Sequence, residues 1–128
     1  MRLNEKISII TGAASGFGKG IAKKFSEEGA KLILADINKD ELEKVSNDLN
    51  QDFFQVDVSS SRSMQELSEY VIKKYETIDI MVNNAGITHL PKPMEDVTEE
   101  EFDKVFSVNS KSVFFCGKFF IPHMKKRK

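Results

Sequence analysis

A short apolar segment that breaks into a glycine-rich turn most constrains how this chain can fold. Residues 7–11 read Ile-Ser-Ile-Ile-Thr, and Gly12, Gly16 and Gly18 follow before a helical pattern over residues 18–28. Gly12 suits a tight turn with positive φ, while Gly16 and Gly18 place no Cβ between the backbone and a bound pyrophosphate, or between helix and strand. A helix that begins there points its N-terminal amides at the phosphates. The segment predicts a dinucleotide-binding turn, although the same glycines also occur in ordinary strand-to-helix turns.

A second apolar segment ends in the acid that such a site needs. Residues 31–36 read Lys-Leu-Ile-Leu-Ala-Asp, so Asp36 stands about 20 residues past the glycines, where a carboxylate can bind both adenosine-ribose hydroxyls. Asp36 could instead cap a helix, but Asn38 is placed for that role. Asp36 repels a 2′-phosphate, and neither Ile37 after it nor Ser15 in the glycine loop offers a compensating cation. The segment therefore favours NAD over NADP.

The composition limits the class of protein. The 128 residues, 40% hydrophobic and 30% charged, suit one soluble domain with a buried core. A net charge of −1 argues against a nucleic-acid surface, and we interpret the basic residues 125–128 as a solvated helix end. Cys116 is the only cysteine, so no disulfide is expected and a cytoplasmic protein is favoured. The sequence shows no apolar run long enough to span a membrane, no signal peptide and no metal-ligand spacing.

Apolar strand patterns and helical patterns alternate along the chain. The sequence predicts strands over residues 7–11, 31–36, 53–58 and 78–82, separated by helices over 21–28, 39–49 and 59–72. Such alternation gives right-handed crossovers and a parallel sheet. The expected fold class is α/β, a Rossmann-type doubly wound parallel sheet with strand order 3-2-1-4, truncated after the fourth strand.

The last third of the chain is predicted to be helical. Residues 98–101 read Thr-Glu-Glu-Glu, a capping box with Thr98 as N-cap and Glu101 reaching back to the helix start. The apolar pattern continues past Asn109, and Pro122 is expected to disturb the last turns. Phenylalanines cover more than one face of this helix, so we expect some of them to form an oligomer contact. An unpaired fourth strand would also favour self-association.

Four motifs, each at the end of an expected strand, together resemble the N-terminal half of the short-chain dehydrogenase/reductase family. They are the glycine loop of residues 11–18, the acid Asp36, the pair Asp57-Val58 and the turn Asn83-Asn84-Ala85-Gly86. The resemblance covers residues 1–128 and implies a single NAD(P)-binding Rossmann domain.

The resemblance implies a set of residues that hold the cofactor. They are Gly12, Ser15, Gly16, Phe17, Gly18, Asp36, Ile37, Asp57, Val58, Asn83, Ala85 and Gly86. Within the set, Asp36 matches the ribose-binding acid and Asp57 the residue that bonds the adenine amino group, with Val58 beside the ring. Asn109 matches the family's catalytic asparagine, which helps to hold a water-linked proton relay. A polar interruption or kink in a long helix is the alternative interpretation of Asn109.

Hydride transfer between nicotinamide and an alcohol or carbonyl substrate is the activity that the resemblance implies. In the family, a tyrosine, a lysine four residues later and a serine carry it, all after the helix with Asn109, so we expect the sequence to end before them and before a fifth strand. Residues 70–74 fit Tyr-x-x-x-Lys, but their helix should lie on a face of the sheet, away from the strand ends where ligands bind. We therefore expect a truncated, inactive oxidoreductase whose substrate would be an alcohol or ketone. The alternative is a non-catalytic dinucleotide-binding or oligomerising module.

Overall fold

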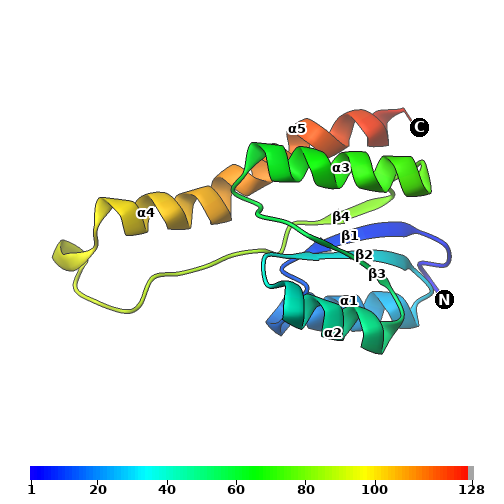
Figure 1. The fold of residues 1–128 in the computed structure, drawn as a ribbon, viewed down its shortest axis with the longest axis horizontal. Helices are drawn as coiled ribbons and strands as arrows, with labels where there is room; N and C mark the ends of the chain where they lie inside the picture. The colour runs from blue at the N-terminus through cyan, green and yellow to red at the C-terminus, as the bar shows by residue number, and fades with distance from the viewer. Residues whose placement is uncertain (127–128) are drawn as a thin grey trace.

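The computed structural model describes residues 1–126, which form a parallel sheet with helices on both faces (Figure 1). Its strands are β1 (Ile7–Thr11), β2 (Lys31–Asp36), β3 (Asp52–Gln55) and β4 (Ile80–Val82). They lie in the order β3-β2-β1-β4, and each neighbouring pair is parallel. The predicted α/β class and strand order 3-2-1-4 are confirmed.

The helices form a layer on each face of the sheet. On one face lie α1 (Gly16–Glu27) and α2 (Lys39–Leu49), and on the other lie α3 (Ser61–Tyr75) and α5 (Ser112–Lys125) (Figure 1). Alternate residues of β1 pack against the helices on opposite faces of the sheet, because successive side chains of a strand point to opposite faces. Ile9 packs with Met64 of α3 and Phe120 of α5, whereas Ile10 packs with the buried residues of α1 and α2. The sheet is thus covered on both sides, as a parallel sheet requires.

Two strands are shorter than predicted. β3 ends at Gln55 rather than at Val58, because Gln55 pairs with Asp36, the last residue of the partner strand β2. β4 begins at Ile80 rather than at residue 78. Val58 and Ile78 are nevertheless buried, so their apolar character reflects core packing outside the strands. The helical boundaries also differ from the prediction, since α1 starts before residue 21 and α3 extends from residue 61 to residue 75.

Polar side chains cap the helices where the sequence predicts. Asn38 Oδ1 accepts a hydrogen bond from the Glu41 N–H at 3.2 Å, as expected for the cap of α2. Thr98 and Glu101 form the predicted capping box of α4 (Glu99–Phe106), with bonds of 3.1 and 3.3 Å. The predicted disturbance at Pro122 is wrong, because α5 continues through it to Lys125. Pro122 is exposed and close to the helix end, where water can satisfy the carbonyl that proline leaves unbonded.

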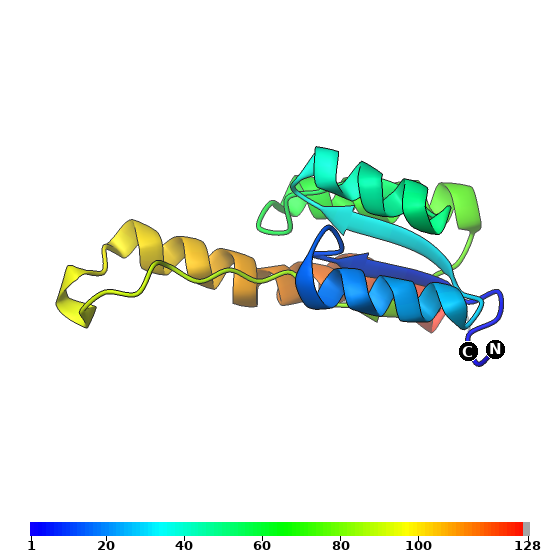
Figure 2. The same ribbon diagram turned by 90° about the horizontal axis from the view of Figure 1, so that it is seen from below.

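The segment between β4 and α5 extends away from the sheet. Figures 1 and 2 both show α4 and the preceding chain projecting from the body, with the short helix η1 (Met94–Asp96) at the far end. Between α4 and α5 the helix widens into a π-helical turn, η2 (Ser107–Lys111). Within residues 1–126, no helix is long and apolar enough to cross a membrane. Arg127 and Lys128, half of the predicted basic helix end, lie outside the described residues.

Candidate functional site

A cleft of about 490 Å³ opens at the carboxyl ends of the strands. Its lining comes from the segments after all four strands and from α4 and η2: Gly12, Ser15, Gly16, Phe17, Asp36, Ile37, Val56, Asp57, Val58, Asn84, Ala85, Gly86, Ile87, Lys104 and Val108. It lies beside the boundary between β1 and β4, where the strand order reverses, which is where open α/β sheets bind ligands. Among the predicted cofactor residues, only Gly18 and Asn83 are outside this lining.

The glycine loop takes a backbone path that most residues avoid. Gly12 and Gly16 have φ values of 65° and 53°, in the left-handed region that glycine adopts without strain. Gly18 has a different role, because a Cβ there would lie 2.0 Å from the carbonyl oxygen of Gly12. Gly18 lies in the first turn of α1 and is buried against the loop, so its lack of a side chain lets the helix start directly beneath the cleft.

The N-terminus of α1 faces the cleft without a side-chain cap. Ser15 occupies the N-cap position with an extended backbone, and its hydroxyl makes no capping bond within the described chain. The first N–H groups of a helix have no intrahelical partner and carry the positive end of its dipole. Both Ser15 and Phe17 line the cleft beside them. This arrangement suits an anionic group such as a phosphate.

The carboxylate of Asp36 joins the end of β2 to the glycine loop. Its Oδ2 accepts a hydrogen bond from the Ala14 N–H at 3.0 Å, and its Oδ1 accepts one from the Asn38 N–H at 3.0 Å. A carboxylate has about four acceptor positions, so two remain for other donors. Asp36 therefore lies fixed at the cleft wall with capacity for the two hydroxyls of a ribose.

Asp57, two residues past the end of β3, is anchored in a similar way. Its Oδ1 accepts hydrogen bonds from the N–H of Ser59 at 3.0 Å and from the hydroxyl of Ser59 at 2.6 Å. Its own N–H donates to the Ser63 hydroxyl at 2.9 Å. These bonds position the second carboxylate of the cleft next to Val58.

Asn84, rather than Asn83, faces the cleft. Its Nδ2 donates to the carbonyls of Thr11 and Gly12 at 3.2 and 3.3 Å, while Asn83 is exposed outside the lining. The Thr11 hydroxyl accepts from the N–H groups of Asn84 and Ala85, both at 3.0 Å. The turn after β4 is thereby fastened to the glycine loop. Thr11 and Asn84 belong to the motifs identified in the sequence but were not among the predicted cofactor-binding residues. The available signal was that adjacent residues leaving a strand point in opposite directions.

Asn109 lies in η2 and its side chain forms hydrogen bonds to the segment that follows β4. Its Oδ1 accepts from the Ile87 N–H at 2.7 Å, and its Nδ2 donates to the Ile87 carbonyl at 2.7 Å. The predicted interruption of the helix is present as a π-helical turn, a feature common at functional sites. The side-chain amide of Asn109 is thus engaged by backbone, which fixes the position of η2 against Ile87 at the cleft wall.

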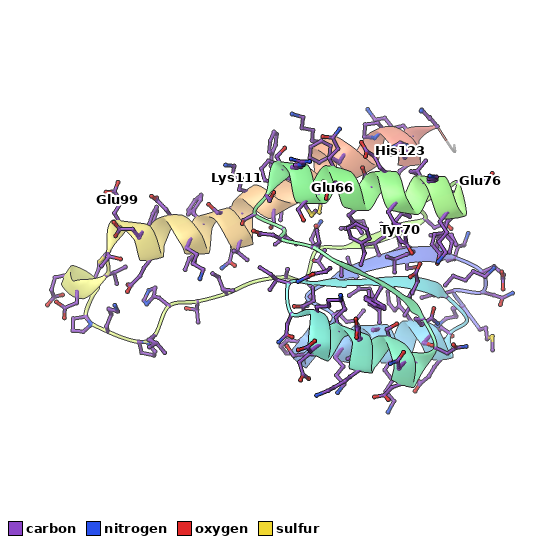
Figure 3. All side chains as sticks on the ribbon, in the orientation of Figure 1. Glu66, Tyr70, Glu76, Glu99, Lys111 and His123 are labelled. Carbon is purple, nitrogen blue, oxygen red and sulfur yellow. The ribbon has the colours of Figure 1, made fainter. Side chains whose placement is uncertain are left out.

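The Tyr-x-x-x-Lys motif of α3 lies away from the cleft. The hydroxyls of Tyr70 and Tyr75 donate to Asp52 Oδ2, both at 2.7 Å, and Lys74 Nζ lies 2.9 Å from the same oxygen. Asp52 starts β3, at the opposite end of the sheet from the cleft, and Tyr70 lies between α3 and the sheet on the side away from α4 (Figure 3).

The electrostatics of this cluster oppose proton transfer by its tyrosines. Burial and the Asp52 carboxylate raise the pKa of Tyr70 and raise that of Tyr75 to about 12. A tyrosine that transfers a proton near neutral pH needs a lowered pKa, so these raised values disfavour catalysis. The hydrogen bonds to Asp52 instead attach α3 to β3. Burial also raises the pKa of the Cys116 thiol to about 12, which disfavours the nucleophilic thiolate.

Comparison with known proteins relates the whole chain to one family. A model of the short chain dehydrogenase family matches residues 6–128. The chain is 38% identical to the 3-oxoacyl-acyl-carrier-protein reductase of Thermotoga maritima, over 100% of this chain and 54% of that protein. It is 39% identical to zerumbone synthase of Zingiber zerumbet, over 98% of this chain and 50% of that protein. The chain thus spans about half the length of the curated relatives it matches.

Solved structures with bound dinucleotide have the same fold. The crystal structure of a 3-ketoacyl-acyl-carrier-protein reductase from Brucella melitensis complexed with NADH gives a TM-score of 0.92 at 38% identity, covering 96% of this chain and 51% of that one. A short chain dehydrogenase/reductase from Burkholderia phymatum in complex with NAD gives 0.91 at 28% identity, covering 97% and 46%.

Proposed function

The chain belongs to the short-chain dehydrogenase/reductase family, and on that basis we propose that it is the cofactor-binding part of an NAD-dependent oxidoreductase. The reaction of the whole protein would be hydride transfer between nicotinamide and an alcohol or carbonyl group. The observation that carries the proposal is the cleft, which gathers the uncapped start of α1, Asp36 and Asp57 along one edge of the sheet. Phosphates, ribose and adenine are the groups that these three features suit.

The geometry of Asp36 supports NAD as the preferred cofactor. Backbone N–H groups of Ala14 and Asn38 donate to the carboxylate at 3.0 Å each, so moving it aside to admit a phosphate would break both hydrogen bonds. A 2′-phosphate on the ribose would bring negative charge against this fixed carboxylate. The structural relatives from Brucella melitensis and Burkholderia phymatum hold NADH and NAD, which supports a nicotinamide dinucleotide as the ligand of the cleft.

Replacement of Asp36 tests the proposal. We expect Asp36→Ala to weaken NADH binding about tenfold or more, because hydrogen bonds to a charged group are lost, and to weaken NADPH binding less. Titration followed by nicotinamide fluorescence measures the dissociation constants of NADH and NADPH on the same sample. A folding defect lowers both affinities and so does not mimic a change in their ratio. The control Asp48→Ala removes the same charge from the exposed surface of α2. A larger loss for NADPH than for NADH would refute the assignment.

The same samples test catalysis by this chain. Tyr70 and Tyr75 are the two tyrosines of the sequence, and both donate to Asp52 away from the cleft. We therefore infer that the 128 residues bind cofactor but do not turn over ketones or alcohols by themselves. Steady NADH consumption with a panel of ketones would contradict that inference.

A second candidate function, an oligomerising module, is favoured by the exposed apolar surface of α4 and α5. Phe102 and Phe106 are 57% and 56% exposed and stack with ring centroids 5.4 Å apart. Phe114 on α5 is 62% exposed. Apolar surface gathered in this way marks contact sites on soluble proteins.

We expect this surface to cause self-association. Light scattering at micromolar concentration should give a mass above that of one chain, and Phe106→Ser should lower it, because the substitution removes apolar area from the contact. Asp48→Ala again serves as a control outside this surface. A wild-type chain that stays monomeric would refute self-association and leave the cofactor proposal intact.

A further inference from the structure

The charge of the cleft depends on one lysine. Among the lining residues, Asp36 and Asp57 are acids and Lys104 is the one cation, so the formal charge of the lining is minus two plus one, or −1. A dinucleotide brings two negatively charged phosphates into this space. Without Lys104 the dianionic pyrophosphate would enter a lining that carries two negative charges and is opposed only by the helix dipole.

Lys104 is held toward the cleft by the helix that carries it. Val108 follows four residues later and also lines the cleft, and residues at this spacing lie on one face of a helix. Asn109 in η2, the turn that directly continues α4, bonds to Ile87, another lining residue, through two hydrogen bonds of 2.7 Å. The face of α4 with Lys104 is thereby presented to the cleft.

The ammonium of Lys104 has no competing partner in the described part of the chain. Glu100 and Glu101 precede Lys104 at helical spacing. Glu101 instead pairs with Lys92 at 2.6 Å and accepts a hydrogen bond from the N–H of Thr98. Lys104 itself makes no ion pair or side-chain hydrogen bond with residues 1–126, although Asp103 and Glu100 are close in sequence. An unpaired, exposed lysine on a flexible stem can reach an anion in the cleft at little cost to other contacts.

We propose that Lys104 is a cofactor-binding residue whose ammonium pairs with the pyrophosphate of the bound dinucleotide. The inference rests on the proposed function, since it requires a dinucleotide in the cleft. It assigns to α4 a charge that the glycine loop does not supply, because Gly12, Gly16 and Ser15 contribute only backbone and hydroxyl groups. Lys104 offsets the two carboxylates that bind ribose and adenine and so permits a dianion between them.

Charge-changing variants of Lys104 test the proposal. We expect Lys104→Gln to weaken NADH binding about threefold to tenfold at about 0.02 M NaCl, and the difference to shrink at about 0.3 M because salt screens a partly exposed pair. ADP-ribose, which keeps the pyrophosphate and lacks nicotinamide, should lose the same factor. Lys104→Arg keeps the charge and should bind within about twofold of wild type.

The control is Lys73→Gln, which removes the same charge from the exposed surface of α3. Its NADH affinity should equal that of the wild type. Wild-type binding together with unchanged affinity in Lys104→Gln would overturn the role of Lys104 and leave the proposed function standing. Equal losses in both glutamine variants, or a loss confined to NADPH, would also overturn the pyrophosphate pairing. A wild type that binds neither NADH nor ADP-ribose would overturn both the inference and the proposed function.

Discussion

Gly18→Ala is expected to destabilise the protein by about 3 kcal/mol and to abolish NADH binding, because the added methyl group has no space. An alanine Cβ at this position would lie 2.0 Å from the Gly12 carbonyl oxygen and 2.5 Å from Asn84 Nδ2. The first of these atoms belongs to the backbone of the glycine loop, so α1 and the loop must separate. Their separation would move the N–H groups of α1 and the anchor of Asp36 at Ala14.

Gly20→Ala in the same helix is the matched control for this prediction. A Cβ at Gly20 meets nothing within 4 Å, and glycine inside a helix is less favourable than alanine by roughly 1 kcal/mol. Gly20→Ala should therefore raise the free energy of unfolding and leave NADH affinity unchanged. Denaturant unfolding and NADH titration measure both variants. A Gly18→Ala protein with wild-type stability would show that the close approach of α1 to the loop is not required.

The arrangement of strands could be predicted from the sequence, but their ends could not. Alternating patterns and right-handed crossovers predict a parallel sheet, and the doubly wound dinucleotide-binding fold predicts the order β3-β2-β1-β4 that is observed. The end of β3 depends instead on where its partner stops, since Gln55 pairs with the last residue of β2. Val56 and Val58 continue the apolar pattern because they face the core and the cleft, and a pattern of apolar residues alone does not distinguish this from strand pairing.

The candidate site was predictable where it follows one strand end and not where distant segments meet. Asp36 ends β2 and Asp57 follows the end of β3 by two residues, and parallel strands bring their carboxyl ends to the same edge of the sheet. Asn84 was missed because the choice between two adjacent asparagines depends on the direction in which β4 ends. Lys104 was not predicted as a cleft residue, because its approach to the cleft depends on the π-helical turn and on the hydrogen bonds between Asn109 and Ile87.

The Tyr-x-x-x-Lys spacing of residues 70–74 does not by itself determine what these residues do. Residues 70–74 have the spacing of a catalytic tyrosine and lysine, and the structure places both side chains on Asp52 at the amino end of β3. The crossover from β3 through α3 to β4 puts this helix on a face of the sheet. The same five residues at the carboxyl edge would have a different chemistry, so the position in the fold decides the function.

Asp52→Ala is expected to lower the free energy of unfolding by about 2–3 kcal/mol, because it leaves three donors of α3 without their shared acceptor. The side chain of Asp52 is only 17% exposed, so water replaces few of the lost bonds. NADH affinity should stay at the wild-type value, since the cluster lies at the opposite end of the sheet from the cleft. Tyr70→Phe, which removes one of the three donors, should cost about 1 kcal/mol and also leave NADH affinity unchanged.

The dependence of stability on pH distinguishes the loss of this cluster from a general packing defect. Burial and the Asp52 carboxylate raise the pKa of Tyr75 from 10.0 to about 12, so its contribution is present below pH 10.0 and is lost as the pH rises toward 12. Burial alone would raise the pKa of Asp52, but the bonds from Tyr70, Lys74 and Tyr75 hold it below 3.8, so its contribution is lost only as the pH falls below that value. Wild type should therefore lose stability more steeply than Asp52→Ala at both extremes, and the two unfolding curves should converge there. A constant difference between the two proteins across the whole pH range would mean that Asp52 contributes packing rather than charge, and that α3 is fastened to β3 by its apolar residues alone.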